Sequence, residues 1–394
     1  MSEIDDILCL HDQVSKGKEK FALATVISTD GPSYRSPGAR SLITENGIFR
    51  GGLSAGCLEG DIACRLDGSV KPFIVEYDLS TEDDIRGFPF GCGGTVEIFV
   101  EPLPNVSALN AVQWLSELHE PAVLFTAVKI QELVTIQDNS ALIVGARFGI
   151  TASGVSEFQG GLSFSDVEQL CFAMFDCKKN KVEDVQLNNQ LVRIFAEYYE
   201  PAIDICLFGD GEDARFLESF ATNVGMNVRR FSRQQIRSST SLLAEIPSLQ
   251  SAFTIVMTHD LNLDAKVLGQ VATAMPPYVG VMGPRARTER ICTGLGLECQ
   301  QLLEHPNLYS PVGLDMTAET PGEIALSILA EIQIVARSRK PGHLRDSVGA
   351  IHERGQSPVA NLLLNAKCGA EDCMDTESKE PRMDIESTET PVVV

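Results

Sequence analysis

Ile203-Asp-Ile-Cys-Leu-Phe208 runs directly into Gly209-Asp-Gly211-Glu-Asp-Ala214, and these twelve residues decide the fold of the second half of the chain. The first six have the nearly continuous apolar character of a strand that is buried in a parallel sheet. The glycine loop then leads into a helical stretch over 215–224. A strand, a glycine turn and a helix in this order predict a βαβ unit at the start of a Rossmann-like domain.

The residues downstream continue this alternation of strands and helices. Thr320-Pro321-Gly322-Glu323 predicts a helix start, with Thr as the N-cap, Pro as the first helical residue and Glu completing a capping box. We therefore expect a Rossmann-like C-terminal domain over 201–352. The further strands expected in it are Val228–Phe231, Thr254–Thr258, Tyr278–Met282 and Glu298–Gln300.

The first 200 residues contain more strand signals than helix signals. Glu45-Asn46-Gly47 stands between two apolar runs, and Asn-Gly in that setting predicts a hairpin. A helix is expected over Val106–Leu118. The fold class is therefore α/β, with a β-rich mixed α/β domain over 1–200 before the Rossmann-like domain. The strands expected in this half are Phe21–Ile27, Arg40–Thr44, Ile48–Phe49, Val96–Val100, Ala122–Val128, Ala141–Val144 and Leu191–Ala196.

Two hexapeptides in this half resemble one another, Val96-Glu-Ile-Phe-Val-Glu101 and Val192-Arg-Ile-Phe-Ala-Glu197. An internal duplication would explain the match. We favour a different interpretation, in which both are edge strands of one mixed sheet, because two short matches support a repeat only weakly. Between them the sequence predicts a helix over Phe164–Phe175 that starts at Ser165 or Asp166.

The charge balance excludes several classes of partner. Acidic residues outnumber basic residues 54 to 32 among 394, and no Lys/Arg-rich block is present, so nucleic acid is not an expected partner. No apolar run approaches the ~18 residues that a membrane span needs, and the start of the chain is acidic where a signal peptide is basic, so we expect a cytoplasmic protein that does not bind membranes. Residues 367–394 combine acids with Ser, Thr and Pro, which predicts a disordered acidic tail.

Two of the eleven cysteines are flanked by glycines. No Cys-x-x-Cys pair occurs, which argues against a disulfide framework and a structural zinc site. Cys57 lies in Gly51–Asp61 and Cys92 in Gly91–Gly94, whereas a structural cysteine such as Cys206 lies among apolar neighbours. We interpret Cys57 and Cys92 as functional thiols, which as thiolates could bind a soft metal or carry a sulfur atom.

Two further segments are candidates for binding an anion. Arg35 and Arg40 lie on backbone stiffened by Pro and Gly, which suits an anionic ligand, although a rigid turn with exposed arginines would have the same sequence. Gly209, Gly211 and Ala214 have the spacing of a dinucleotide fingerprint at a helix start. The segment 229–233 is Arg-Arg-Phe-Ser-Arg where an NAD-binding protein offers Asp or Glu, which counts against NAD and leaves a loop kept for packing as the alternative.

Polar residues also follow the later strands of the Rossmann-like sheet. His259 comes directly after the strand Thr254–Thr258, where it is either an acid–base or metal-ligating residue or a cap of the strand end. Arg285 follows the strand Tyr278–Met282. Because parallel strands end at one edge of a sheet, both side chains are expected to face the same crevice.

Taken together, the motifs resemble the XdhC/CoxI family of xanthine dehydrogenase accessory factors. The matching segments follow one another in order from about residue 20 to 352. They are SYRSPGA (33–39), GGLSAGCLEGDIA (51–63), GCGG (91–94), LFGDGEDA (207–214), VMTH (256–259), YVGVMGPRAR (278–287) and PVGLDMTAETPGEIALSILAE (311–331).

The resemblance implies a cytoplasmic, homodimeric chaperone without multiple turnover. Such a protein binds molybdenum cofactor in its plain or dinucleotide form and helps a cysteine desulfurase to replace an oxo ligand by sulfur. It then delivers the cofactor to a xanthine dehydrogenase-like molybdenum hydroxylase. By the family pattern Cys57, with Glu59 beside it, and Cys92 would contact molybdenum or sulfur, and a nucleotide portion would lie at the Rossmann-like loop. The residues expected to bind the cofactor are Arg35, Arg40, Gly52, Gly56, Cys57, Cys92, Gly209, Gly211, Ala214, His259 and Arg285.

Two other functions stay open. One is an NAD(P)-dependent oxidoreductase that uses the Rossmann-like domain, with His259 as its acid–base. The other is a thiol redox sensor that uses Cys57 and Cys92, which requires their Cα atoms to approach within the ~7 Å that a disulfide permits.

Overall fold

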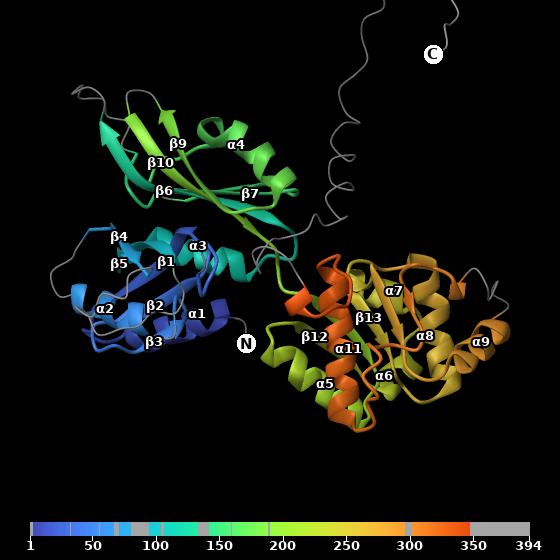
Figure 1. Ribbon diagram of the computed structural model, residues 1–394. Helices are drawn as coiled ribbons and strands as arrows, with labels where there is room; N and C mark the ends of the chain where they lie inside the picture. The colour runs from blue at the N-terminus through green and yellow to red at the C-terminus, as the bar shows by residue number, and fades with distance from the viewer. Residues whose placement is uncertain are drawn as a thin grey trace, which may run out of the picture. The chain divides into compact units, whose positions relative to one another are not determined.

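The computed structural model describes residues 3–346, apart from 32, 55, 67–70, 80–93, 104–105, 133–141, 159, 188–189 and 296–301. Its strands form three five-stranded sheets (Figure 1). Sheets A and B are antiparallel and come from the first 199 residues, and sheet C is parallel and comes from residues 204–309. The expected mixed α/β fold with a Rossmann-like parallel sheet is confirmed. The expected acidic tail over 367–394 lies outside the described residues.

Sheet A and its helices form the first repeat, residues 3–102. Its elements are α1 (Glu3–Val14), β1 (Phe21–Asp30), β2 (Arg40–Thr44), β3 (Phe49–Gly51), α2 (Cys57–Arg65), β4 (Phe73–Asp78) and β5 (Thr95–Pro102). The strand order is β3-β2-β1-β5-β4. Helix α2 packs its Leu58 and Ile62 against the face of β1 that carries Ala22 and Ala24. Helix α1 packs against the opposite face, which carries Leu23.

Sheet B and its helices form the second repeat, residues 106–199. Its elements are α3 (Val106–Ser116), β6 (Ala122–Glu132), β7 (Arg147–Thr151), β8 (Val155–Glu157), α4 (Phe164–Cys177), β9 (Lys181–Leu187) and β10 (Gln190–Tyr199). The strand order is β8-β7-β6-β10-β9. Helix α4 packs its Val167 and Cys171 against the face of β6 that carries Val123 and Phe125. Helix α3 covers the other face, at Leu124.

The two repeats have the same order of elements and the same sheet topology. The matching hexapeptides lie in β5 and β10, and each of these strands is hydrogen-bonded on both sides, β5 to β1 and β4, and β10 to β6 and β9. The favoured interpretation of both as edge strands of one mixed sheet is therefore wrong. The alternative of an internal duplication accounts for the topology, because only a repeated unit would reproduce helix, three strands, helix and two strands in one strand order.

Further sequence matches support the duplication. Gly38-Ala-Arg-Ser-Leu-Ile-Thr44 and Gly145-Ala-Arg-Phe-Gly-Ile-Thr151 share five of seven residues and form β2 and β7 with the turns before them. Gly-Gly-Leu-Ser occurs at 51–54 before α2 and at 160–163 before α4. The backbone geometry matches as well. The Gly38 N–H donates to the Val26 carbonyl at 2.8 Å, and the Gly145 N–H donates to the Ala127 carbonyl at 2.8 Å.

The repeats are joined by reciprocal ion pairs. Arg40 in β2 donates two hydrogen bonds to Glu197 in β10, and Arg147 in β7 donates two to Glu101 in β5. Each pair thus joins the second strand of one repeat to the last strand of the other. The side chains of Arg147 and Glu101 are 5% and 0% exposed, so both charges are buried. A cluster of buried apolar side chains that comes from both repeats accompanies the pairs, with Ile27, Phe99, Val128 and Phe195.

Sheet C has the order β12-β11-β13-β14-β15, and all neighbouring strands are parallel. Its strands are β11 (Asp204–Phe208), β12 (Asn227–Phe231), β13 (Phe253–Val256), β14 (Tyr278–Val281) and β15 (Leu308–Tyr309). The strand order reverses between β11 and β13, so the loops after these two strands flank the switch point of the sheet. Such a crevice is where ligands bind in open α/β sheets.

Helices cover both faces of sheet C (Figure 1). On one face lie α5 (Glu212–Asn223) and α11 (Pro321–Ala336), which pack around Leu217 and Ile328. The capping box expected at Thr320 is confirmed, since its hydroxyl accepts from the Glu323 N–H. The other face carries α6 (Arg233–Ser238), α7 (Leu242–Glu245), α8 (Leu261–Ala274) and α9 (Arg285–Gly294).

Two local elements differ from their predictions, and a third cannot be compared because it lies outside the described residues. Leu142–Val144 is not a strand, because the chain turns at Gly145, with φ of 90°, and the strand β7 starts only at Arg147. Helix α4 starts at Phe164 instead of at Ser165 or Asp166, since Ser163 is its N-cap and the Asp166 carboxylate accepts from the Ser163 N–H. The strand expected at 298–300 lies outside the described residues.

Within the described part of the chain, no helix combines the length and the apolar character that crossing a membrane would require.

Candidate functional site

Cys57 is the first residue of helix α2. Gly56 before it is the N-cap and has φ of 111°, in the left-handed region that glycine adopts at low cost. The thiol is free and partly buried. The N-terminal end of a helix carries a partial positive charge, which favours an anionic group such as a thiolate or a bound oxyanion there. The structure thus places Cys57 at a helix start.

Glu59 holds the segment before Cys57 in place. Its carboxylate accepts hydrogen bonds from the Leu53 N–H at 2.7 Å, the Ser54 N–H at 3.0 Å and the Ser54 hydroxyl at 2.5 Å. Burial by itself would raise the pKa of Glu59, but the hydrogen bonds from Ser54 and Leu53 outweigh it and lower the pKa below its ordinary value. The residue is 1% exposed, and in this structure its carboxylate binds the main chain before Cys57, while the expected contact with a cofactor stays a prediction.

Arg40 is paired with a carboxylate of the second repeat. Its guanidinium is buried, donates to Glu197 and donates to the Gly38 carbonyl at 3.1 Å. Burial lowers the pKa of Arg40, but the charge and hydrogen bonds of Glu197 raise it above the ordinary value overall, so the ion pair is retained. A buried guanidinium that is already paired with a carboxylate is not free for a phosphate. Arg40 nevertheless lines the cavity described below, and its expected contact with a ligand stays a prediction.

The main chain of Arg40 connects this ion pair to the cysteine segment. The Gly52 N–H donates to the Arg40 carbonyl at 2.9 Å. A Cβ on Gly51 would lie 2.2 Å from the same carbonyl oxygen, which only glycine avoids. Arg40 directly follows the SYRSPGA segment, and its carbonyl binds Gly52 of the GGLSAGC segment. The buried ion pair of Arg40 therefore fixes the main chain where these two motifs meet.

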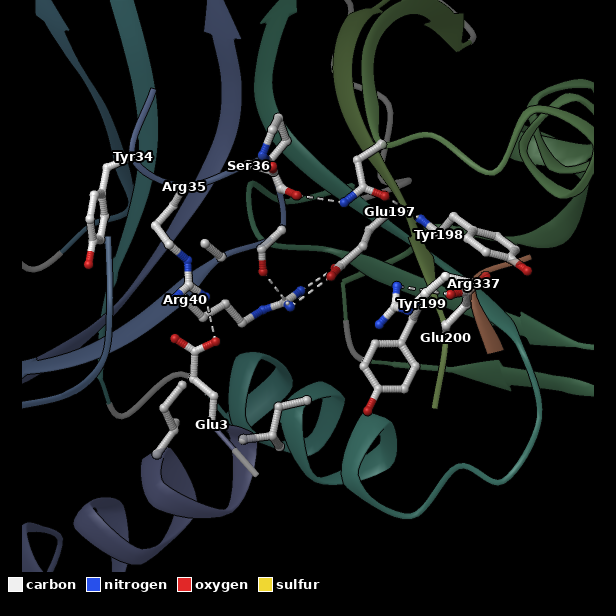
Figure 2. A pocket seen from close by; sticks show the side chains of 16 residues that line it. Glu3, Tyr34, Arg35, Ser36, Arg40, Glu197, Tyr198, Tyr199, Glu200 and Arg337 are labelled. Carbon is white, nitrogen blue, oxygen red and sulfur yellow. Dashed lines mark hydrogen bonds and ion pairs between the residues drawn. The ribbon is translucent and has the colours of Figure 1, made fainter. Parts of the chain in front are cut away.

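Arg35 lies beside a cavity of about 350 Å³ (Figure 2). The cavity is lined by α1, by residues 34–40 and by the end of β10. Arg35 donates to Glu3 at 2.6 Å, and the two side chains are 35% and 38% exposed, so a ligand can reach both. The Arg35 Nη1 atom lies 3.8 Å from the position of a Cβ on Gly52. The structure thus places Arg35 and Gly52 beside one another.

Two lining residues were missed from the sequence. The Asn180 side-chain amide donates to the Pro37 carbonyl at 2.7 Å, and its oxygen accepts from the Tyr198 N–H at 2.8 Å, so Asn180 connects the SYRSPGA segment to β10. Glu3 pairs with Arg35. Neither belongs to a motif, and only the fold brings them to the cavity.

The Rossmann-like loop has the local structure that its glycines predict. A Cβ on Gly209 would lie 2.5 Å from the Met257 carbonyl oxygen, Gly211 is the N-cap of α5, and Ala214 is fully buried. The first turn of α5, however, contains acids of its own. Asp213 accepts from the Ala214 N–H at 3.0 Å through Oδ1. A carboxylate therefore occupies the end of the helix where a dinucleotide places its phosphates.

His259 lies across the switch point from this carboxylate. Its Nε2 atom is 2.8 Å from the second Asp213 oxygen, and its φ is 59°, which is uncommon outside glycine. Arg233 makes a second bridge, with Nε donating to the Thr258 carbonyl at 2.8 Å and lying 3.2 Å from the Asp210 carboxylate. The loops after β11, β12 and β13 are thus held to one another by side chains of the protein.

These contacts predict weak dinucleotide binding. Asp213 repels a pyrophosphate at the start of α5, and Arg233, which follows β12, is already paired with Asp210. We expect NADH and NADPH to bind with Kd above about 1 mM, roughly −4 kcal/mol or weaker. Titration of nicotinamide fluorescence measures this directly. The variant Asp213→Asn is the matched comparison and should bind more tightly, whereas micromolar binding by the unaltered chain would contradict the prediction.

The remaining sequence-predicted residues are spread over the described part of the chain. Arg285 is more than half exposed and lies 3.5 Å from Glu289, one helical turn later in α9. Its neighbour Arg287 is the residue that faces inward, where it pairs with the buried Asp264. Cys92 lies outside the described residues, so its distance from Cys57 stays untested. Among the residues that the structure does describe, no three His, Cys, Asp or Glu side chains are grouped so as to hold a metal ion.

Comparison with known proteins agrees with this arrangement. The model of the XdhC and CoxI family matches residues 15–71, and the model of the XdhC Rossmann domain matches residues 205–332. The chain is 26% identical over 343 residues to a probable subunit of xanthine dehydrogenase from Bacillus subtilis, covering 82% of this chain and 94% of that protein. It is 23% identical over 319 residues to the molybdenum cofactor insertion chaperone PaoD of Escherichia coli, covering 79% of this chain and 82% of that protein.

A solved structure is similar over nearly its whole length. The crystal structure of a xanthine dehydrogenase from Bacillus halodurans matches with a TM-score of 0.62 and 26% identity, covering 88% of this chain and 98% of that one. The two matching family segments hold the cysteine segment and the Rossmann-like loop in the order in which the motifs occur. The chain is thus similar to the XdhC/CoxI family over both segments that the family models match.

Proposed function

We propose that this protein is an accessory chaperone that binds molybdenum cofactor as cargo and passes it to a xanthine dehydrogenase-like molybdenum hydroxylase. The named relatives support this proposal, since one is a probable subunit of xanthine dehydrogenase and the other is a molybdenum cofactor insertion chaperone. The protein holds the cofactor without chemical turnover in place. The plain cofactor and its dinucleotide form are both candidate cargos.

The observation that carries the proposal is the placement of Cys57. A free, partly buried thiol lies at the start of a helix, directly after a left-handed glycine. A soft sulfur ligand suits molybdenum, and the helix end favours the anionic groups of the cofactor. Arg35, Gly52 and Gly56 are the further residues proposed to bind the cargo, since Arg35 is accessible and lies beside Gly52.

Four finer proposals rest on the family resemblance. Cys57, together with Cys92, contacts the molybdenum or the sulfur that a cysteine desulfurase supplies in exchange for an oxo ligand. The protein acts as a homodimer in the cytoplasm. The Rossmann-like loop at Gly209, with His259 and Arg285, takes at most a nucleotide portion of the cargo, since Asp213 disfavours phosphate there. Two domains, at 1–200 and 201–352, divide these tasks.

The test measures transfer as well as binding. Molybdenum cofactor released from a donor enzyme is mixed with the protein, bound and free cofactor are separated, and the bound fraction is added to a cofactor-free xanthine dehydrogenase. Retention of the cofactor followed by recovery of hydroxylase activity is expected, and Cys92→Ala should retain less. Failure of the unaltered protein to retain any cofactor would overturn the proposal. A substrate-dependent reduction of NAD(P) by the protein alone would favour the oxidoreductase function instead.

A further inference from the structure

The duplication supplies an internal comparison for the segment before Cys57. Both repeats contain Gly-Gly-Leu-Ser before a helix that packs on its sheet, and the leucine is buried in each, Leu53 and Leu162. In the second repeat the helix begins at once, because Ser163 is its N-cap and Phe164 its first residue. In the first repeat the helix begins only at Cys57, three residues after Ser54.

In both repeats a carboxylate binds the serine of the Gly-Gly-Leu-Ser segment, but the number of residues between the serine and the carboxylate differs. Asp166, three residues after Ser163, accepts from its N–H at 2.9 Å and from its hydroxyl at 2.7 Å, which is an ordinary capping box. Glu59, five residues after Ser54, accepts from the same two groups and also from the Leu53 N–H. The Ser54 hydroxyl oxygen in turn accepts from the Gly56 N–H at 3.2 Å and the Leu58 N–H at 3.1 Å.

The network therefore compensates for the missing first turn of the helix. The donors of Leu53, Ser54, Gly56 and Leu58 are satisfied by two side chains in place of helical carbonyls. Without the Glu59 carboxylate, the N–H of the buried Leu53 and the N–H and hydroxyl of the half-buried Ser54 would lose their acceptor. The second repeat shows that the same fold does not need this arrangement, because its helix is closed directly by Asp166.

We propose that Glu59 is a positioning residue for Cys57: by binding the main chain of Leu53 and Ser54 outside the helix, it makes Cys57 the first helical residue and sets the place of its thiol. The functional part of this inference rests on the proposed binding of cofactor at Cys57. It assigns to Glu59 no contact with the cargo. Among the described residues, the two repeats differ here: Glu59 binds Leu53 and Ser54 before α2, whereas Asp166 forms a capping box with Ser163 at the start of α4.

The experiment compares Glu59→Ala, Glu59→Gln and, as the matched control in the second repeat, Asp166→Ala. The rate of alkylation of Cys57 by iodoacetamide is followed by mass spectrometry of the peptide that contains it, and the buried Cys171 in α4 reports opening of the whole fold. Retention of molybdenum cofactor and thermal unfolding are measured on the same proteins. Gln keeps an oxygen that can accept from the two backbone N–H groups, so it is the conservative variant.

Glu59→Ala should speed the alkylation of Cys57 by at least about tenfold and lower cofactor retention by a similar factor, with Cys171 unchanged. Glu59→Gln should recover most of both, and Asp166→Ala should leave both unchanged even where it lowers the unfolding temperature. Unchanged alkylation of Cys57 in Glu59→Ala, or an equal effect on Cys171, would overturn the inference. If the unaltered protein retains no cofactor, the proposed function fails, while the alkylation rates still decide whether Glu59 positions Cys57.

Discussion

Glu101→Ala is expected to lower the free energy of unfolding by about 3–5 kcal/mol, because it leaves the Arg147 guanidinium buried without its partner. The two side chains are 0% and 5% exposed, so water cannot replace the lost carboxylate. The Gly145 carbonyl, which accepts from Arg147 at 2.9 Å, is a weaker partner than a carboxylate. Urea unfolding followed by circular dichroism and by fluorescence measures the change.

Glu97→Ala is the matched control, since Glu97 pairs with Arg193 across the same repeats but the two side chains are 21% and 29% exposed. It should cost about 1 kcal/mol or less. Replacing both partners, as in Glu101→Leu with Arg147→Met, should cost less than Glu101→Ala alone, since a buried pair exchanged for apolar groups leaves no unpaired charge. A cost below about 1 kcal/mol for Glu101→Ala would show that the pair does not hold the repeats together.

Gly51→Ala is expected to destabilise the protein by about 2–4 kcal/mol, the second large effect. Gly51 has φ of 83°, and an added Cβ would lie 2.2 Å from the Arg40 carbonyl oxygen. The backbone strain is common to any residue with a side chain, and the clash adds to it because that carbonyl belongs to β2 and cannot move freely. We further expect loss of cofactor retention, since Gly52 is anchored to the same carbonyl.

Two other glycines allow the cost of backbone strain to be measured separately from the cost of the steric clash. Gly47 has φ of 80° with nothing within 4 Å of an added Cβ, so Gly47→Ala should cost only about 1–2 kcal/mol. Gly60 lies inside α2 with open space around it, so Gly60→Ala should stabilise the protein by up to about 1 kcal/mol. Equal costs for Gly51→Ala and Gly47→Ala in urea unfolding would mean that the Arg40 carbonyl yields to the new methyl group.

The sequence predicted sheet C well because parallel, buried strands leave strong local signals. Ile203–Phe208 is apolar nearly throughout, and Thr320 to Glu323 show the helix start directly. The first half is harder to predict because its strands are short and antiparallel. The chain turns at Gly145, so β7 begins at Arg147, after the apolar run that the sequence predicts as a strand. The match of Gly38-Ala39-Arg40 to Gly145-Ala146-Arg147, taken with the two hexapeptides, is the signal in the sequence that indicates the duplication.

The candidate site was predicted in part. Cys57, Gly56 and Arg35 stand in glycine-rich segments that local sequence makes conspicuous, and the structure gives them positions compatible with a ligand. The partners that decide the roles of Arg40 and Glu59 could not be read from the sequence. Glu197 lies 157 residues from Arg40, and the length of the segment that Glu59 spans depends on where α2 begins.

Capture of molybdenum cofactor by Cys57→Ala is the decisive test of the proposed binding of the cofactor at Cys57. Cys64→Ala is the matched control, since Cys64 is an exposed free cysteine on the same helix. The account predicts that the unaltered protein and Cys64→Ala retain the cofactor, whereas Cys57→Ala retains at least about tenfold less, equivalent to about 1.4 kcal/mol. Equal retention by Cys57→Ala and the unaltered protein would contradict it.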